Sequence, residues 1–523
     1  MLIMEMVTTM LFDYLGRRTL YSPDALAIID AGKTPERRFT YRDLNERANR
    51  LAHWLHDVAG VTKGDRVAIL ARDGVEHLDC FYACCKLGAV HTALNWRMHW
   101  KELDGVVRQT SPKVLLFSDD FKEAAVHLRT SAGDVTELLT HCIHLEGQGI
   151  EGSIALDDAL AQSAATPVVC EELTGEDTAA LLFTGGTTGM PKGAMISHRM
   201  INWNTLNTVV HDITHGDVYL NVFPLFHTGG LFTYTATQIT FGGTTILLRQ
   251  FDPERVLELI ERERVTVFAG VPTMYQMLTQ AKNWETADLR SLRFCTSGGA
   301  PLPVPLIEKY VREKGIRFKQ GFGMTEFGPG VFALSPEDAK RKAGSIGRPN
   351  FFVDVKVIDD ENRALGANEV GELLLKGPSM CSGYFRDPAA TAESVDADGW
   401  LHTGDLVRFD DEFFFFVIGR KKDMFISGGE NVFPVEIESV LYTHPAVHMC
   451  AVIGVPDARW GEVGKACVVL KPGATVTGED IIEFLKGNLA QYKVPKTVEI
   501  LDALPLSGMG KIQKNDLKKK YSL

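Results

Sequence analysis

A run of glycine, threonine and lysine between Leu181 and Met195, LLFTGGTTGMPKGAM, is the segment best suited to chemistry. Its glycines expose backbone N–H groups, its hydroxyls donate hydrogen bonds and Lys192 adds positive charge, so the loop could close over a polyphosphate. The spacing fails the Walker A pattern because a proline stands between the last glycine and Lys192. A kinase or GTPase is therefore disfavoured, and a Gly-rich surface turn is the alternative for this loop alone.

Six further short blocks follow this loop along the chain. They are FPLFHTGG (223–230), TSGGAPLP (296–303), QGFGMTEFG (320–328), LHTGDL (401–406), GRKKDMFISGGENVFPVEIE (419–438) and PLSGMGKIQK (505–514). In this order and at these distances, the set resembles the adenylate-forming superfamily of acyl-CoA synthetases, adenylation domains and luciferases. The resemblance covers nearly the whole chain.

The resemblance implies a two-step reaction that uses ATP, Mg²⁺ and coenzyme A. A carboxylate attacks the α-phosphate of ATP to give an acyl-adenylate and pyrophosphate, and a thiol then displaces AMP. ATP and a carboxylate are both anionic, so Mg²⁺ and lysines must offset their repulsion and hold them in line. The protein itself needs no covalent nucleophile.

For the phosphates, the resemblance implies a cradle formed by one continuous loop together with Lys192. Its other residues are Thr184, Gly185, Gly186, Thr187, Thr188 and Gly189. The family usually has serine where Gly185 stands, so we expect a weaker grip on the β- and γ-phosphates without loss of activity. Thr325 would bind the α-phosphate, and Glu326 with Thr184 would hold the metal.

Two further sets would bind the nucleoside. The adenine pocket would comprise Gly298, Gly299, Ala300, Pro301, Gly321, Phe322, Gly323 and Met324. Phe322 replaces the common tyrosine, which keeps ring stacking and removes a phenol donor. Asp405 and Arg420 would bind the ribose, since a carboxylate can accept two hydroxyl protons.

The remaining roles involve the C-terminal part of the chain and the acyl pocket. Lys511 would contact the acyl carboxylate and the α-phosphate during the first step. Lys422 matches the position about which the family's C-terminal domain rotates between the two steps. Ser427, Gly428 and Gly429 would then lie near the pantetheine tunnel, and His227 would stand at the mouth of the acyl pocket.

The sequence predicts that the carboxylic acid substrate is a hydrophobic monocarboxylate. Phe226-His227 lacks the Asp that amino-acid-activating relatives carry after the phenylalanine, and residues 222–234 offer no Arg or Lys for a second carboxylate. The choice between a fatty and an aromatic acid stays open. Two other classes also stay open: a ligase that loads a carrier-protein thiol, and a catalytically silent nucleotide-binding protein.

Alternating patterns predict the elements that position these blocks. YRDLNERANRLAHWL places Leu44, Ala48, Leu51 and Leu55 on one helical face, and DRVAIL and PKVLLF predict buried strands. This alternation favours an α/β fold with largely parallel sheets in a large multi-subdomain N-terminal domain over residues 1–420. The pattern changes near Gly419, and the charged, Gly-rich segment GRKKDMFISGGE predicts a hinge to a small α+β domain over 421–523, which the resemblance implies is mobile.

The composition of the chain argues against several classes of function. The 523-residue chain has a formal net charge of −12, which argues against nucleic-acid binding. Nine cysteines form no CxxC pair, so the spacing suggests neither a zinc site nor a redox dithiol. The apolar start lacks a basic region, and no stretch is long enough to span a bilayer. We expect a cytoplasmic monomer or homodimer, without stable membrane insertion, whose partners are a small carboxylic acid and CoA.

Overall fold

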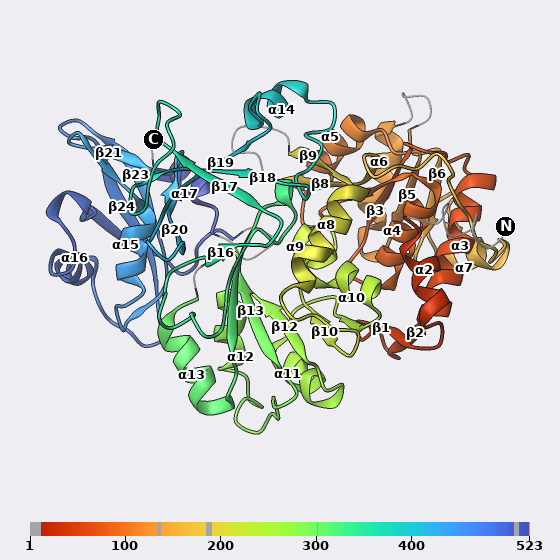
Figure 1. Cartoon of the computed structure of the whole chain (residues 1–523), viewed down its shortest axis with the longest axis horizontal. Helices are drawn as coiled ribbons and strands as arrows, with labels where there is room; N and C mark the ends of the chain where they lie inside the picture. Colours follow the sequence, from red (N-terminus) through yellow and green to blue (C-terminus); the bar gives the residue numbers. More distant parts are fainter. Residues whose placement is uncertain (1–11, 133–137, 185–190, 301, 507–511, 522–523) are drawn as a thin grey trace.

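The computed structural model describes residues 12–132, 138–184, 191–300, 302–506 and 512–521. Two large, mainly parallel sheets flanked by helices form the N-terminal part, a four-stranded antiparallel sheet follows, and a small α+β domain ends the chain (Figure 1). The expected α/β fold is confirmed.

The first sheet has seven strands in the order β7-β6-β5-β3-β4-β8-β9, and only the β8–β9 pair is antiparallel. The strands are β3 (Arg66–Leu70), β4 (Val90–Ala93), β5 (Val114–Phe117), β6 (His141–His144), β7 (Ile154–Ala155), β8 (Thr178–Thr184) and β9 (Lys192–Ser197). The interior strands β3, β5 and β8 are largely apolar because helices cover both faces of a parallel sheet, whereas β4 also buries His91 and Thr92.

The second sheet has nine strands in the order β16-β15-β14-β13-β12-β10-β11-β1-β2. The strands are β1 (Leu26–Asp30), β2 (Arg37–Thr40), β10 (Val218–Asn221), β11 (Thr244–Leu247), β12 (Val267–Gly270), β13 (Phe294–Gly298), β14 (Phe318–Phe322), β15 (Phe332–Leu334) and β16 (Arg348–Pro349). Its central strands run parallel, so the carboxyl ends of β13 and β14 meet at one edge.

Helices complete the layers of the N-terminal part. They are α2 (Tyr14–Tyr21), α3 (Tyr41–Asp57), α4 (Val75–Leu87), α5 (Trp100–Thr110), α6 (Lys122–Ala132), α7 (Leu156–Ala161), α8 (His198–Val209), α9 (Thr228–Gly230), α10 (Ala236–Phe241), α11 (Pro253–Arg262), α12 (Pro272–Leu278), α13 (Val304–Lys314) and α14 (Pro388–Ser394). A capping box between Thr40 and Asp43 starts α3. The predicted apolar face of α3 is confirmed, since its four aliphatic residues are fully buried.

The last two sheets are mainly antiparallel, and the one parallel pair among their described strands is β24 with β25. β17 (Asp354–Ile358), β18 (Gly371–Lys376), β19 (Leu401–Phe409) and β20 (Phe415–Arg420) pair in that order. The C-terminal sheet contains β21 (Phe425–Ser427), β22 (Glu430–Val432), β23 (Val447–Asp457), β24 (Gly461–Leu470) and β25 (Thr497–Ile500), with α15 (Pro434–Leu441), α16 (Gly478–Lys486) and α17 (Lys514–Tyr521). One buried apolar cluster lies between the two large sheets, a second joins β15 to the four-stranded sheet, and the C-terminal sheet packs with its helices around a core of its own.

Candidate active site

The β8–β9 hairpin holds the two described ends of the predicted phosphate loop side by side. Thr184, the last residue of β8, stands opposite Lys192, the first residue of β9, and its Oγ1 donates to the Lys192 carbonyl oxygen at 3.4 Å. The loop residues Gly185, Gly186, Thr187, Thr188 and Gly189 lie outside the described residues. The hairpin therefore places Lys192 and Thr184 side by side at the same end of the two strands.

A tyrosine connects this lysine with the predicted metal-binding glutamate. The Lys192 Nζ lies 5.3 Å from the centroid of the Tyr384 ring, and the Tyr384 hydroxyl donates to Glu326 Oε1 at 2.8 Å. Burial, together with the neighbouring carboxylate, raises the pKa of Tyr384, so the phenol keeps its proton and donates. Tyr384 was not among the predicted site residues, because a tyrosine after a glycine in a turn carries no signal of its own.

The carboxyl ends of β13 and β14 bring the predicted adenine and α-phosphate residues together. Gly298 stands opposite Gly321 in the parallel register, and Phe322 ends β14 with its ring edge-on to Phe332 at 5.8 Å. The turn that follows depends on Gly323, since a Cβ there would lie 2.0 Å from the Pro329 carbonyl oxygen. This is the strand edge at which parallel sheets bind nucleotides.

The same edge carries the rest of this set. Gly299, with a φ of +82°, and Ala300 follow β13, while Met324 and Thr325 lead from β14 into the short 3-10 turn Thr325–Phe327. Glu326 sits in this turn, and its carbonyl oxygen accepts a hydrogen bond from Cys381 N–H at 2.8 Å. Pro301 lies outside the described residues.

Asp405 and Arg420 form a cross-strand pair between β19 and β20. The two residues are directly opposite in the antiparallel register, and Arg420 Nε lies 2.7 Å from Asp405 Oδ1. Asp405 is 3% exposed, while nearly half of the Arg420 side chain is exposed. The pair thus presents a buried carboxylate whose charge is partly compensated by a guanidinium that reaches solvent.

The predicted hinge follows this pair immediately. Lys422 lies in the turn between β20 and β21, and its carbonyl oxygen accepts a hydrogen bond from Lys518 Nζ of α17 at 3.3 Å. Burial and the nearby Arg420 charge lower the pKa of Lys422. Ser427 ends β21, and Gly428 and Gly429 have φ values of +62° and +91°. Lys511 lies outside the described residues.

Residues 223–230, which we call the gate loop, contain His227. The His227 Nδ1 accepts a hydrogen bond from Gly229 N–H at 3.1 Å and caps the one-turn helix α9. A Cβ on Gly230 would lie 2.2 Å from the Pro224 carbonyl oxygen, so the loop can close this tightly only with glycine there. A π-helix over Leu231–Thr235 follows; sequence periodicity did not predict it.

Asp73, at the start of α4, anchors the gate loop from the other large sheet. Its Oδ1 accepts the Leu225 N–H at 2.8 Å, and the side chain is buried. Burial raises the pKa of Asp73 to about 7. Asp73 was missed because an aspartate before a glycine is typical of an ordinary turn.

Asp73→Asn is expected to flatten the pH dependence of stability. The folded protein holds the Asp73 proton more tightly than the unfolded chain, so its contribution is most favourable below about pH 4 and is lost as the pH rises toward 7. A shift of this size corresponds to at most about 4 kcal/mol. Relative to wild type, the Asp73→Asn variant should therefore gain in Tm as the pH rises between these values. Thermal unfolding of both proteins from pH 5 to 8 checks this, and a pH-independent difference would contradict it.

The fold and this strand-edge arrangement are those of an adenylate-forming enzyme. The chain belongs to the AMP-binding enzyme family: the family's model matches residues 17–385, and the model of the AMP-binding enzyme C-terminal domain matches residues 436–511. Along the described residues, no helix combines the length and apolar character needed to cross a membrane.

Similar proteins whose names give an activity indicate which kind of adenylate-forming enzyme this is. The chain is 40% identical to a feruloyl-CoA synthase from Amycolatopsis sp, over 97% of this chain and 98% of the relative. It is 36% identical to the long-chain-fatty-acid–CoA ligase FadD13 of Mycobacterium tuberculosis, over 97% and 98%. The crystal structure of ATP-bound MatB from Rhodopseudomonas palustris superposes with a TM-score of 0.88 at 33% identity, covering 98% of this chain and 99% of that one. The chain is an AMP-forming acid–CoA ligase.

Proposed function

We propose that the enzyme activates an aromatic monocarboxylic acid that carries a hydrogen-bond donor and transfers it to CoA. The carboxylate oxygen attacks the α-phosphorus of ATP, the bond to the β-phosphate oxygen breaks and pyrophosphate leaves. The CoA sulfur then attacks the acyl carbonyl carbon, and AMP leaves. Lys192, Lys511 and Thr325 would stabilise the charge that develops at the phosphates in the first step.

Magnesium fits the oxygen donors beside Lys192. Glu326 offers a carboxylate and Thr184 a hydroxyl, and Mg²⁺ prefers such hard oxygen ligands together with substrate phosphates. The Tyr384 hydroxyl donates a hydrogen bond to one carboxylate oxygen of Glu326, which would orient the other oxygen toward the ion. When bound, the ion would offset the negative charge of the phosphates. On the ribose, Asp405 and Arg420 would bind the hydroxyls.

The buried side chain of Asn204, in α8, favours an aromatic acid with a polar substituent as the substrate. Its Nδ2 donates to the Phe232 carbonyl oxygen at 2.8 Å, whereas its Oδ1 is buried and has no hydrogen-bond partner among the described residues. Gly328, in the block that follows β14, lies against this oxygen: a Cβ there would be 2.8 Å from Asn204 Oδ1. A hydroxyl or amine on an aromatic ring could satisfy this acceptor, whereas a plain alkyl chain would leave it unpaired.

A panel of acids tests this proposal. Pyrophosphate release would be measured with fatty acids, unsubstituted aryl acids and hydroxyl- or amino-substituted aryl acids, each with and without CoA. The proposal expects the substituted aryl acids to give the highest kcat/KM, with AMP and a thioester as products. A preference for fatty acids would overturn the aromatic assignment. Release that stalls after one turnover with or without CoA would indicate a carrier-protein thiol as the acceptor.

Asn204→Leu is expected to reverse this preference. The substitution replaces the unpaired acceptor with an apolar side chain. The kcat/KM for the substituted aryl acid should therefore fall by about tenfold, while the kcat/KM for the unsubstituted acid should stay the same or rise. Asn202→Leu is the matched control because it makes the same change on another face of α8. Equal losses for both acids in Asn204→Leu would contradict a role in recognition.

We also propose that residues 1–420 and 421–523 move relative to each other about Lys422. The chain passes from the four-stranded sheet to the C-terminal sheet between Arg420 and Phe425. Rotation there would allow Lys511 to serve the first step, and Ser427, Gly428 and Gly429 to line the thiol tunnel in the second.

A further inference from the structure

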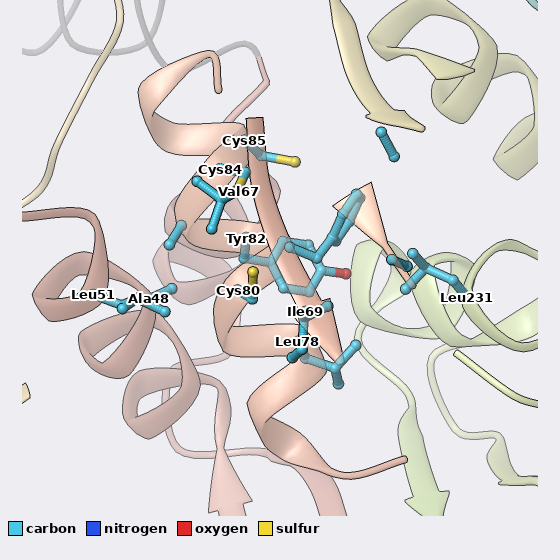
Figure 2. Packing of buried hydrophobic residues seen from close by; sticks show 14 of the residues in the cluster. Ala48, Leu51, Val67, Ile69, Leu78, Cys80, Tyr82, Cys84, Cys85 and Leu231 are labelled. Atoms are coloured by element: carbon cyan, nitrogen blue, oxygen red, sulfur yellow. The ribbon is translucent and has the colours of Figure 1, made fainter. Parts of the chain in front are cut away.

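Three metal-binding side chains meet inside the N-terminal core, away from the residues assigned to catalysis. Cys80 and Cys84 of α4 and His91 of β4 each offer one ligand atom, and these atoms all lie within 4.8 Å of one another. All three residues are at most 1% exposed. Figure 2 shows both cysteines on α4 inside this core, with the sulfur of the adjacent Cys85 directed away from them.

A second histidine, His77, lies on the same face of the helix, although its ring nitrogens are not among the atoms that lie within 4.8 Å of one another. His77, Cys80 and Cys84 are spaced i, i+3 and i+7, so their side chains share one face of α4. The ring centroid of His77 lies 6.4 Å from that of His91. This H-x₂-C-x₃-C spacing differs from the CxxC pattern whose absence argued against zinc from the sequence, and it becomes a ligand set only when β4 brings His91 onto the helix.

One ring nitrogen of each of the two histidines is available as a ligand atom. The Nδ1 atoms of His77 and His91 are buried and have no hydrogen-bond partner among the described residues. The His77 Nε2 lies 3.1 Å from the Ala71 carbonyl oxygen, which can only accept, so Nε2 carries the proton and Nδ1 keeps its lone pair.

The charge and chemical type of the ligands determine which metal ion such a site would bind. An apolar interior strongly disfavours net charge, and two thiolates with neutral imidazoles balance the charge of a divalent cation. Thiolate and imidazole are the ligands that zinc prefers, in tetrahedral sites with two cysteines and two histidines among others. A hard ion such as Mg²⁺ would find no oxygen donor in this set.

We propose that Cys80, Cys84 and His91, with His77 as the fourth ligand, form a structural zinc site that fastens α4 to β4. Binding converts two thiols to thiolates and releases two protons, while the imidazoles contribute their lone pairs. Because a cysteine binds zinc as the thiolate, protons compete with the metal, and affinity should fall as the pH is lowered. The site would act on stability and leave the chemistry of the reaction unchanged.

Metal content and cobalt spectroscopy of the full-length protein test the site. Wild type produced in zinc-supplemented medium should retain about one zinc ion per chain after dialysis, and refolding with Co²⁺ should give thiolate-to-cobalt charge-transfer absorption. Cys80→Ala and Cys84→Ala should lose both signals, whereas Cys85→Ala, the same change one residue along the helix, should keep them. His91→Gln serves as a second ligand variant if a cysteine variant fails to fold.

Thermal unfolding gives an independent readout. Chelation should lower the Tm of wild type and of Cys85→Ala, and should leave the Tm of the ligand variants unchanged, since only an occupied site stabilises the folded state. Wild type that binds neither zinc nor cobalt would overturn the proposal. Equal binding by wild type and by Cys80→Ala and Cys84→Ala would overturn it as well.

Discussion

Asp405→Ala is expected to lower kcat/KM for ATP by about 10²- to 10³-fold, because hydrogen bonds to a charged group are worth about 1.5–3 kcal/mol each and two ribose hydroxyls would lose theirs. The substitution also leaves Arg420 without the carboxylate 2.7 Å from its Nε. The loss should appear chiefly in the KM for ATP if both hydroxyls are bound before the chemical step. Initial rates of pyrophosphate release over a range of ATP concentrations measure it.

Asp360→Ala is the matched control for this experiment. Asp360 also pairs with a cation, Lys421 Nζ at 2.9 Å, but its side chain is 83% exposed, so its removal should change neither kcat nor KM appreciably. Thermal unfolding of both variants separates a loss of nucleotide binding from a loss of structure. An Asp405→Ala enzyme with wild-type KM for ATP would rule out the ribose assignment.

Lys422→Pro is expected to slow thioester formation by about 100-fold while adenylation stays close to wild type, because a proline ring fixes φ at a position that must rotate between the two steps. The N–H of Lys422 donates no hydrogen bond within the described part of the chain, so proline removes none in this conformation. Single-turnover measurements of acyl-adenylate formation and of its consumption by CoA separate the two half-reactions.

Lys422→Ala controls for the side chain. It removes the ammonium, whose pKa burial lowers, and leaves the backbone free to rotate, so both half-reactions should continue at near wild-type rates. Equal losses of both half-reactions in Lys422→Pro would contradict the hinge. A loss of thioester formation in Lys422→Ala as large as that in Lys422→Pro would assign the effect to the ammonium instead.

The residues that could be predicted from the sequence are those in short blocks with fixed spacing. Blocks such as GFGMTE and HTGDL specify both residue types and their order, and the strand patterns around them place the blocks at strand ends. In the structure, Gly298 lies opposite Gly321 and Asp405 lies opposite Arg420. The α/β class was predictable for the same reason, since buried parallel strands read as continuous apolar runs.

The residues that were missed act through long-range packing. Tyr384, Asp73 and Asn204 form hydrogen bonds to residues 58, 152 and 28 positions away in the sequence, respectively, and none belongs to one of the quoted blocks. An isolated tyrosine, aspartate or asparagine predicts a turn, a cap or a core hydrogen bond equally well. Their contribution becomes visible only when the two large sheets are placed against each other.

The contact chain from Lys192 through Tyr384 to Glu326 has a thermodynamic consequence. Lys192 belongs to the seven-stranded sheet, Glu326 follows β14 of the nine-stranded sheet, and Tyr384 follows β18 of the four-stranded sheet. These sheets already share buried cores, because one apolar cluster contains residues of both large sheets and another joins β15 to the four-stranded sheet. A polyphosphate bound here would add a polar link among the same three sheets, so nucleotide binding should stabilise them together.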